Sequence, residues 1–429
     1  MDTPKTQKKL VLKELSSEKS GRLFFIVAYI CYLLYCATRN FYPQALAEII
    51  PSGLFTKDVA GMVSSAYMIG YGSGMFINGY LSEKVQPFFY ITLSFGLSAG
   101  TSALMYAYSL TSAPSIIPFI VIWGIAGYVQ SGVWPILIRL TTAIMPANKS
   151  ANACSHLYIS SIVGITGAYL ISQQILRMFN WRTLFLVSAL SALFLTLFFY
   201  FSTLKIKRSC VSYTLVSPEK SEKKQKSSEH SLFKLLFMSG GIFILFVVIL
   251  NCFAYKGFAD MVPTMLVEEF GVSADFSVMV STLLPVCTVV GAYLGRFLYH
   301  RLFHSEVRTT AYCMLLATAV YALIIVVGFA SLGFVMATIM VVAIMTSCAS
   351  TMCVGLVPLR FARYSLAGSL AGYFNGAGYV GSSASALAVG IIAQNFGWSN
   401  TIIMLGAFMA LGSIFAFLVI RKWRNFVHN

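Results

Sequence analysis

The sequence predicts an all-α membrane protein in which twelve transmembrane helices form two pseudo-symmetric bundles of six helices. Three observations lead to this fold class. Hydrophobic residues make up 58% of the 429 residues and charged residues only 10%, a composition that a soluble surface could not hide. Apolar runs of about 20 residues, the length that crosses a bilayer, recur from Leu23 to Ile420. Residue patterns of the first half of the chain return in the second half at a constant offset.

The expected spans fall into two groups of six. Residues 1–22 form a polar N-terminal tail, residues 23–204 the first bundle, residues 233–420 the second bundle and residues 421–429 a short C-terminal tail. Residues 205–232 are rich in Lys, Ser and Glu and have too few apolar side chains to fold alone, so they are expected to be a flexible linker. The expected spans are Leu23–Gln44, Asp58–Tyr80, Phe88–Tyr108, Ser115–Ala143, Ala151–Leu176, Trp181–Thr203, Phe233–Tyr255, Ala274–Leu298, Thr309–Ala330, Gly333–Val357, Leu366–Ala393 and Asn400–Ile420.

The two groups of spans repeat each other at an offset of 217 residues. Asp58, Met62, Val63, Ser64, Val163, Gly164, Phe179 and Trp181 recur as Asp275, Met279, Val280, Ser281, Val380, Gly381, Phe396 and Trp398. Such a constant offset is not expected of unrelated helices. It predicts parallel halves that are related by an axis along the membrane normal.

The distribution of charge predicts the orientation. A net charge of +16 would suggest a nucleic-acid partner if it lay on one globular face, but here most Lys and Arg residues lie in tails and loops, so no nucleic acid is expected. An even number of spans places both termini on one side. The connections on the other side hold only Lys57, Arg177 and Arg182, so both termini are expected in the cytoplasm. The N-terminal tail is too polar for a cleaved signal peptide.

The sequence shows no sign of an enzyme, a cofactor or a metal site. The nine cysteines form no CxxC pair and no metal-type spacing with histidine, and most lie inside apolar runs, where a cysteine acts as a small hydrophobic residue. No catalytic constellation is present, and no Gly-Lys-Ser/Thr loop for a nucleotide.

Two cations stand apart from the tails and loops. Arg39 lies deep in the first span and Lys256 lies at the end of the seventh, 217 residues later. A cation toward the bilayer centre costs at least about 2.5–3.5 kcal/mol, so it usually faces a cavity or a partner. Two cations from matching helices would face one central cavity and clamp a divalent anion. Two alternatives stay open: either cation could reach the outer interface, or Lys256 could pair with Asp260 four residues later.

Other polar side chains at membrane depth could bind an anion in the same cavity. Each of them could equally join two helices or lie at the membrane interface. They are Tyr35, Tyr67, Tyr71, Gln130, Ser161 and Asn375. Gly368, Gly372 and Gly376, spaced by four residues, favour close helix packing in the eleventh span.

The stretch after the second span resembles the signature of facilitator transporters. It contains Gly79, Glu83 and Lys84, a glycine with an acidic and a basic residue. The resemblance implies a gating element on the inner face, in which the acid caps helices and forms ion pairs. The repeat-equivalent stretch, Gly295 to Arg301, lacks the acid.

Several short stretches in both halves resemble the organophosphate:phosphate antiporter family of the major facilitator superfamily. They are Arg39-Asn40-Phe41, Ala66-Tyr67 with Tyr71-Gly72, Gly132-Val133-Trp134-Pro135 with Arg139, Gly257 with Asp260 and Pro263, Gly355-Leu356, Ala367-Gly368, Ala371-Gly372, Gly378-Tyr379-Val380-Gly381 and Phe396-Gly397-Trp398. The resemblance implies the major facilitator fold and the exchange of glycerol phosphate or hexose phosphates for inorganic phosphate. It adds Trp134 and Tyr255 to the expected substrate site, and Arg139 and Asp260 to the expected gating residues.

The chain departs from this family in the register of its cations. The family's arginines in spans one and seven fall on Thr38 and Tyr255, so Arg39 and Lys256 each follow by one residue, about 100° around a helix. Either local winding restores the direction of the side chains, or the cavity is rebuilt. The family's histidine in span five falls on Ser161 and its lysine in span two falls on Met75.

We therefore expect a secondary active transporter of a small anionic metabolite that works by alternating access, with an organophosphate exchanged for inorganic phosphate as the leading hypothesis. One alternative is proton-coupled transport of a neutral or zwitterionic solute such as an amino acid, or drug efflux, with Asp260 as the sole candidate carboxylate. Another is a non-transporting sensor of sugar phosphates. The expected setting is a monomer within the lipid bilayer of a bacterial inner membrane, without an obligate protein partner.

Overall fold

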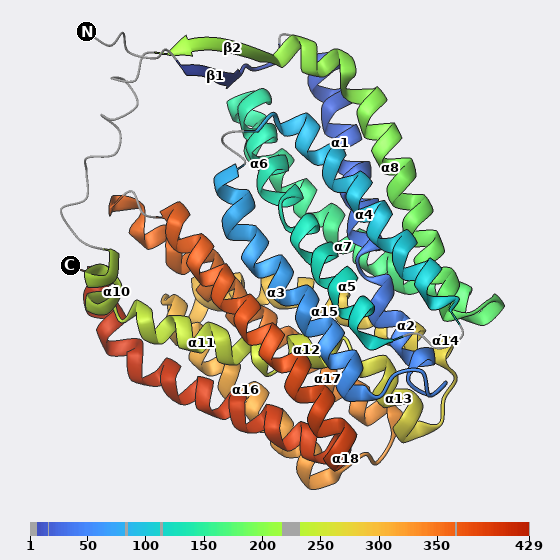
Figure 1. Cartoon of the computed structure of the whole chain (residues 1–429). Helices are drawn as coiled ribbons and strands as arrows, with labels where there is room; N and C mark the ends of the chain where they lie inside the picture. Colours follow the sequence, from blue (N-terminus) through green and yellow to red (C-terminus); the bar gives the residue numbers. More distant parts are fainter. Residues whose placement is uncertain are drawn as a thin grey trace, which may run out of the picture.

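The computed structural model describes residues 7–15, 17–81, 85–111, 115–216, 232–364 and 367–428, and almost all of them are helical. Figure 1 shows two helical bundles, one coloured blue to green and the other yellow-green to red, which meet near α2, α3, α13 and α14. We call the described residues 7–216 the N half and residues 232–428 the C half.

The N half consists of eight helices and two short strands. They are β1 (Gln7–Leu12), α1 (Glu18–Thr38), α2 (Phe41–Ile49), α3 (Lys57–Leu81), α4 (Pro87–Ser109), α5 (Ile116–Ser131), α6 (Val133–Ile144), α7 (Ala147–Met178), α8 (Trp181–Cys210) and β2 (Val211–Val216). Polar side chains begin some of the helices. Gln86 accepts a hydrogen bond from the Phe89 amide at the start of α4, and Asn180 accepts one from the Arg182 amide at the start of α8.

The C half follows with a similar succession. Its elements are α10 (Leu232–Ser239), α11 (Gly241–Phe253), α12 (Lys256–Ala259), α13 (Val262–Phe270), α14 (Ala274–Ser281), α15 (Leu283–Leu298), η1 (Tyr299–Phe303), α16 (Glu306–Val327), α17 (Leu332–Ser350), η2 (Thr351–Leu356), η3 (Val357–Tyr364) and α18 (Ala367–His428). Gly397, at φ +82°, is non-helical and divides α18 into two helices.

The element bounds carry the 217-residue repeat. Adding 217 to the bounds of α3 (57 and 81) gives 274 and 298, the first residue of α14 and the last of α15. Adding it to those of α5 gives 333–348, which lies inside α17. The same periodicity is therefore present in the helices as in the sequence.

The count of spans is close to the expected twelve. Within the described residues, ten helical segments are long and apolar enough to cross a membrane. One of them, Leu370–Val427, is 58 residues long and contains the break at Gly397, so it has room for two crossings. The 25-residue α3 is not among the ten. Two crossings in Leu370–Val427 and a further one in α3 would bring the ten segments to twelve spans. Twelve spans remain a prediction, and both observations support it.

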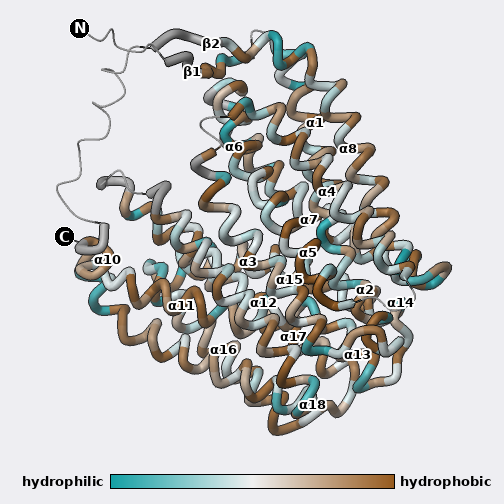
Figure 2. The backbone as a smooth tube through the Cα atoms, in the orientation of Figure 1, coloured by the Kyte–Doolittle hydropathy of each residue, from teal (hydrophilic) through white to brown (hydrophobic). Residues whose placement is uncertain are grey.

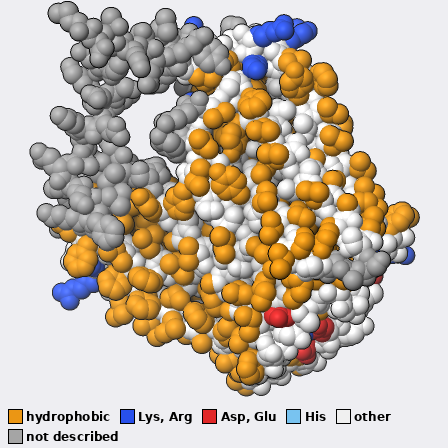
Figure 3. All heavy atoms as spheres, viewed as in Figure 1, with side chains coloured by type: hydrophobic (Ala, Val, Ile, Leu, Met, Phe, Trp, Pro, Cys, Tyr) orange, Lys and Arg blue, Asp and Glu red, His pale blue; other side chains and the backbone are white. Residues whose placement is uncertain are grey.

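The outer surface is apolar over most of the helices, as a lipid-facing surface requires. In Figure 2, brown hydrophobic residues recur along most helices. In Figure 3, orange hydrophobic side chains cover much of the visible surface of both halves. Large apolar side chains are exposed in both halves, for example Phe201, Val326 and Leu418. On the face shown in Figure 3, carboxylates lie near α13, at the end of the molecule opposite the chain termini. All nine cysteines are free and seven are buried.

Residues 205–216 differ from the flexible linker that the sequence predicts. α8 continues to Cys210, and β2 pairs antiparallel with β1 from Leu12↔Val211 to Gln7↔Val216. The amide of Lys13 donates to the carbonyl of Cys210 at 2.8 Å. The N-terminal tail supplies the partner strand that the linker sequence lacks by itself. Residues 217–231, the rest of the expected linker, lie outside the described residues.

Candidate functional site

The first membrane-spanning segment is broken at Arg39. α1 ends at Thr38 and α2 begins at Phe41. The Thr38 hydroxyl donates to the carbonyl of Tyr35 at 2.8 Å, and the Asn40 amide donates to the carbonyl of Cys36 at 2.6 Å. These bonds satisfy carbonyls that the end of a helix leaves without partners. The break between the two helices falls at Arg39, the residue that carries the charge, and at Asn40.

Arg39 has only neutral partners. Its Nη1 donates to the hydroxyl of Tyr71 at 3.3 Å, and its guanidinium carbon lies 5.8 Å from the centroid of the Tyr71 ring, within range of a cation–π interaction. Among the described residues, no carboxylate lies within ion-pair distance of Arg39. The side chain is half-buried. Its positive charge is therefore not neutralised by the part of the protein that the structure describes.

Tyr71, which contacts Arg39, belongs to a group of aromatic residues from both halves. The ring of Tyr71 lies 4.9 Å from that of Tyr379 on α18 and 6.0 Å from that of Tyr67. Tyr67 stacks on Trp123 at 5.2 Å, and its hydroxyl donates to Oε1 of Gln130 at 2.7 Å. Because Tyr379 belongs to the C half, the surroundings of Arg39 depend on how the two halves meet.

Lys256 also lies at a break. α11 ends at Phe253 and Lys256 is the first residue of α12, while the Tyr321 hydroxyl donates to the carbonyl of Ala254 at 2.6 Å. The Lys256 side chain is exposed. α12 ends at Ala259, so Asp260 is the C-cap and lies outside the regular turn, and the two side chains are not within 4 Å. The intrahelical ion pair, one of the two alternatives above, is not formed here.

The segment that carries Lys256 lies against the helices beside Arg39. α12 contacts α18, which carries Tyr379, and α3, which carries Tyr71. Tyr379, which packs on Tyr71, follows Gly378, and a Cβ on that glycine would lie 3.2 Å from the Cys252 sulfur in α11. α3, α12, α18 and the α1–α2 break therefore lie close together.

The other expected substrate residues divide into two groups. Trp134 stacks on Tyr32 at 5.1 Å, the Ser161 hydroxyl donates to the carbonyl of Tyr158 at 2.6 Å, and Tyr35 lies 3.5 Å from Ser98; all of these contacts are inside the N half.

Tyr71 contacts Arg39, Tyr67 packs near Tyr71, and Gln130 accepts from Tyr67, as described above. Asn375 reaches across the halves, where its amide donates to the sulfur of Met75 at 3.2 Å, and Tyr255 is buried at the start of α12.

Only some of the expected gating residues lie within the described part of the chain. Gly79 lies near the end of α3, whereas Glu83 and Lys84 lie outside the described residues. In α6, Nη1 of Arg139 is buried and has no hydrogen-bond partner among the described residues.

The C half has a buried carboxylate, Glu306, shortly after Gly295 to Arg301, the stretch that lacks the acid of the facilitator signature. Glu306 accepts from Nε of Arg360 at 2.6 Å and from Nε1 of Trp423 at 3.1 Å.

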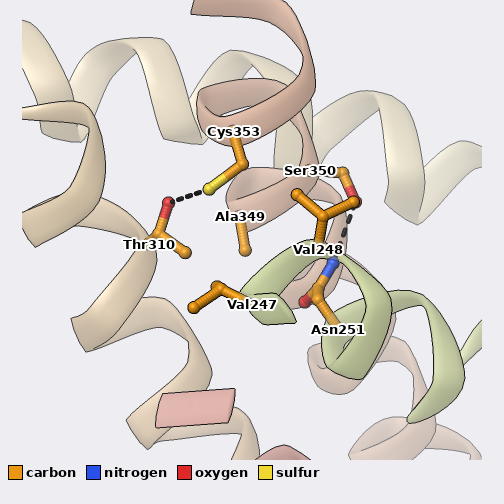
Figure 4. A pocket seen from close by; sticks show the side chains of 7 residues that line it. All are labelled: Val247, Val248, Asn251, Thr310, Ala349, Ser350 and Cys353. Atoms are coloured by element: carbon orange, nitrogen blue, oxygen red, sulfur yellow. Dashed lines mark hydrogen bonds between the residues drawn. The ribbon is translucent and has the colours of Figure 1, made fainter. Parts of the chain in front are cut away.

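A small pocket lies within the C half, between α11, α16, α17 and η2 (Figure 4). It is lined by Val247, Val248, Asn251, Thr310, Ala349, Ser350 and Cys353. Its polar side chains form hydrogen bonds in two pairs, Asn251 with Ser350 and Thr310 with Cys353. The pocket leaves no room for a water molecule. It contains none of the expected substrate residues, so we attribute it to imperfect packing.

Two aromatic residues in the contacts around Tyr71 were not among the site residues that the sequence predicts: Tyr379, which packs on Tyr71, and Trp123, which packs on Tyr67. Tyr379 lies in the Gly378–Gly381 stretch, which was a signal of its importance. Trp123 had no such signal, because its contact with Tyr67 depends on the packing of α5 against α3. Within the described residues, no group of three or more His, Cys, Asp or Glu side chains could hold a metal ion.

The comparisons with known proteins agree with this architecture. Residues 28–330 match the family model of the Major Facilitator Superfamily. The glycerol-3-phosphate transporter of Bacillus subtilis (strain 168) is 25% identical over 416 residues, which cover 91% of this chain and 90% of that protein. The membrane sensor protein UhpC of Salmonella typhimurium is 22% identical over 172 residues, 40% of this chain and 38% of that protein.

Solved structures show the same fold at low sequence identity. A bacterial homologue of the human lysosomal transporter Spinster, in an inward-facing and unoccupied conformation, superposes with a TM-score of 0.78 at 14% identity, covering 96% of this chain and 99% of that one. The D-xylose–proton symporter superposes with a TM-score of 0.68 at 14% identity, covering 92% and 97%.

Proposed function

The chain belongs to the Major Facilitator Superfamily, and we propose that it exchanges a small organophosphate for inorganic phosphate across the membrane. It is an integral membrane transporter rather than an enzyme. A relative that covers nine-tenths of the chain is named a glycerol-3-phosphate transporter, and shorter matches include a probable hexose phosphate transport protein of Chlamydia trachomatis, 29% identical over 122 residues, 28% of this chain and 25% of that protein.

One observation supports an anionic substrate above all others. Arg39 and Lys256 occupy repeat-equivalent positions, and neither forms an ion pair within the described residues. An uncompensated charge on the half-buried Arg39 is costly at membrane depth, and a bound anion would offset that cost. A phosphate group offers oxygen atoms to both cations at once, which favours a divalent phosphate over a monovalent anion.

Both cations are shifted by one residue relative to the related family, and the helix breaks near them support local winding as the feature that restores the direction of their side chains. Each cation follows by one residue the position at which the related family carries its arginine. In this chain a helix ends just before each cation, at Thr38 and at Phe253. A helix that stops at Thr38 or Phe253 and starts again at Phe41 or Lys256 can change register there, so the side chains need not keep the 100° offset that a continuous helix would impose.

Transport would follow from motion of the two halves about this site. We propose that the halves rock about Arg39 and Lys256, so that the site opens to one side of the membrane and then to the other. Two facing cations without an anion repel each other, which would slow the return of the empty carrier and couple it to exchange. The proposed location is a bacterial inner membrane with both termini in the cytoplasm.

The test is exchange of labelled phosphate in proteoliposomes that contain unlabelled phosphate. Arg39→Ala and Lys256→Ala should each lower the exchange rate about 10- to 150-fold, because a hydrogen bond to a charged group contributes about 1.5–3 kcal/mol. Lys149→Ala is the control, since Lys149 pairs with Glu18 at 2.9 Å on the surface of the N half. Exchange at the parent rate in both cavity variants would exclude the anion site.

A sensor is the second candidate, because two relatives are named membrane sensor protein UhpC, from Salmonella typhimurium and Escherichia coli. A sensor would bind glycerol phosphate or glucose phosphate without moving it. Binding that raises the thermal stability of the parent protein, together with no uptake into proteoliposomes, would support the sensor over the exchanger.

A further inference from the structure

Away from the proposed substrate site, three polar side chains join the halves at the end of the molecule opposite the chain termini (Figure 1). Lys57 is the first residue of α3 in the N half, Glu268 lies on α13 and Trp398 on α18 in the C half. Nζ of Lys57 lies 2.8 Å from Oε2 of Glu268, and Nε1 of Trp398 donates to the same oxygen at 2.7 Å. One carboxylate oxygen therefore connects both halves.

Two more contacts reinforce this connection. The backbone amide of Lys57 donates to Oε1 of Gln394 at 2.9 Å, and the Lys57 ammonium group lies 5.6 Å from the centroid of the Trp398 ring. The Lys57 side chain is 15% exposed and that of Glu268 is 27% exposed. Because water is partly excluded, these charged hydrogen bonds are stronger than those of a fully exposed pair.

The neighbouring charge also favours Lys57 at this position. Glu269 is next to Glu268, and burial together with the charge of Glu268 raises the pKa of Glu269, while Lys57 opposes that rise. Lys57 therefore also favours the ionised form of Glu269, and removal of Lys57 would leave the charge of Glu268 next to Glu269 without that opposing effect.

No other ion pair in the described part of the chain links the halves. Arg22–Glu18 and Lys149–Glu18 lie within the N half, and Arg360–Glu306 lies within the C half.

Directly behind the Lys57–Glu268 pair, α3 and α18 pack closely. A Cβ on Gly61 would lie 2.5 Å from the carbonyl oxygen of Ala386, and the hydroxyls of Ser65 and Ser383 are 3.1 Å apart. The contacts of Lys57, Glu268 and Trp398 therefore lie at one end of a tight seam between α3 and α18.

We propose that Lys57, Glu268 and Trp398 form a latch that closes this end of the transporter and sets how often it opens. This proposal rests on alternating access in the proposed function but not on the identity of the substrate. Opening at this end must separate Lys57 from Glu268 and Trp398, whereas opening at the end that carries the termini leaves these contacts intact. The latch residues are positioning residues, since they do not contact the proposed anion site.

The rate at which a cysteine at position 65 reacts with a maleimide tests the latch. Ser65 is 7% exposed and contacts Ser383 across the halves, so Ser65→Cys should react only when this end opens. In purified protein, Lys57→Ala or Glu268→Gln should raise the reaction rate of that cysteine about tenfold, and Trp398→Phe, which keeps an aromatic ring but removes the N–H donor, should raise it less. Mass spectrometry of the peptide containing residue 65 separates its reaction from that of the nine native cysteines.

Two controls make the result specific. Lys149→Ala removes an ion pair of similar length, 2.9 Å, within one half, and should leave the rate unchanged. The exchanged pair Lys57→Glu with Glu268→Lys should react more slowly than Lys57→Glu alone, because it restores opposite charges across the seam.

Parent rates in both Lys57→Ala and Glu268→Gln would overturn the latch. The labelling assay needs no substrate, so a faster reaction without phosphate exchange would support the latch and contradict the proposed function. The reverse result would contradict the latch alone.

Discussion

At the scale of single residues, the direction of one charged side chain depends on a neutral neighbour. Arg39 donates to the hydroxyl of Tyr71, whose ring in turn packs on Tyr379 of the other half. The tyrosine orients the guanidinium group without neutralising it. A carboxylate in the same place would form an ion pair with Arg39 and compete with an anionic substrate.

Tyr71→Phe should therefore weaken phosphate binding while leaving the charge of Arg39 intact. Loss of one hydrogen bond costs about 0.5–1.5 kcal/mol of binding free energy. The phosphate concentration that half-saturates exchange should therefore rise about threefold to tenfold. Tyr35→Phe is the matched control, because the Tyr35 hydroxyl lies 3.5 Å from Ser98 inside the N half. Equal shifts in both variants would mean that Tyr71 has no particular role.

Arithmetic along the chain can single out residues from the sequence, but it cannot show which distant residues they contact. Arg39 and Lys256 were singled out by the repeat, and both prove to lie at helix breaks. The contact between Lys57 and Glu268 could not be predicted, because 211 residues separate them and only the docking of the halves brings them together. Whether the predicted site residues bind substrate is for the exchange experiments to decide.

At the scale of helices, close approach of backbones limits which residues fit between them. α3 and α5 pack side by side in the N half, and a Cβ on Gly127 would collide with the carbonyl oxygen of Tyr67 and lie 3.1 Å from the amide nitrogen of Tyr71. Small residues allow such approach in membrane helices, where burial of apolar surface gives little drive for association. The position of both tyrosines beside Arg39 thus depends on a glycine in another helix.

Gly127→Ala should lower the thermal stability of the protein and disturb the Arg39 site. Overpacking of this kind costs about 1–3 kcal/mol, because the backbones cannot move apart without loss of other contacts. Gly167→Ala should be nearly neutral, since a Cβ there meets nothing within 4 Å. Thermal unfolding of the two purified variants makes the comparison, and equal stabilities would contradict the proposed packing constraint.

The sequence predicted the long helices well but missed the paired strands. Apolar runs and the 217-residue offset define α3 and the joined α14–α15 because both signals are local or periodic. Strands β1 and β2 pair residues about 200 positions apart, and neither segment shows a periodicity that would identify its partner. The polar composition of residues 205–216 therefore suggested flexibility where the structure has a continued helix and a strand.

At the scale of the whole molecule, the halves must both fit together and come apart. The seam between α3 and α18 joins small residues, Gly61 against Ala386 and Gly390, next to the latch. Tight contact favours the arrangement seen here, and the absence of large interlocking side chains at this point allows separation. Mutations in the seam should therefore change the balance between open states more than the stability of either half.

Gly61→Ala should prevent full closure at the end opposite the termini. The added methyl would lie 2.5 Å from the Ala386 carbonyl oxygen and 3.1 Å from the Cα of Gly390, and both belong to the other half. Exchange requires closure at this end once per cycle, so we expect the phosphate exchange rate to fall about tenfold, the equivalent of about 1.4 kcal/mol. The reaction of a cysteine at position 65 should become faster in the same variant, because the seam no longer closes over it.

Gly124→Ala distinguishes this effect from a general loss of packing. Its Cβ would meet Ala66 of the same half at an ordinary distance, 3.6 Å to the carbonyl oxygen, so exchange and labelling should both stay near the parent values. If Gly61→Ala slowed exchange without faster labelling, the defect would lie elsewhere in the cycle. Slower exchange and faster labelling together would mean that closure of this seam, rather than binding at Arg39, is the step that the substitution impairs.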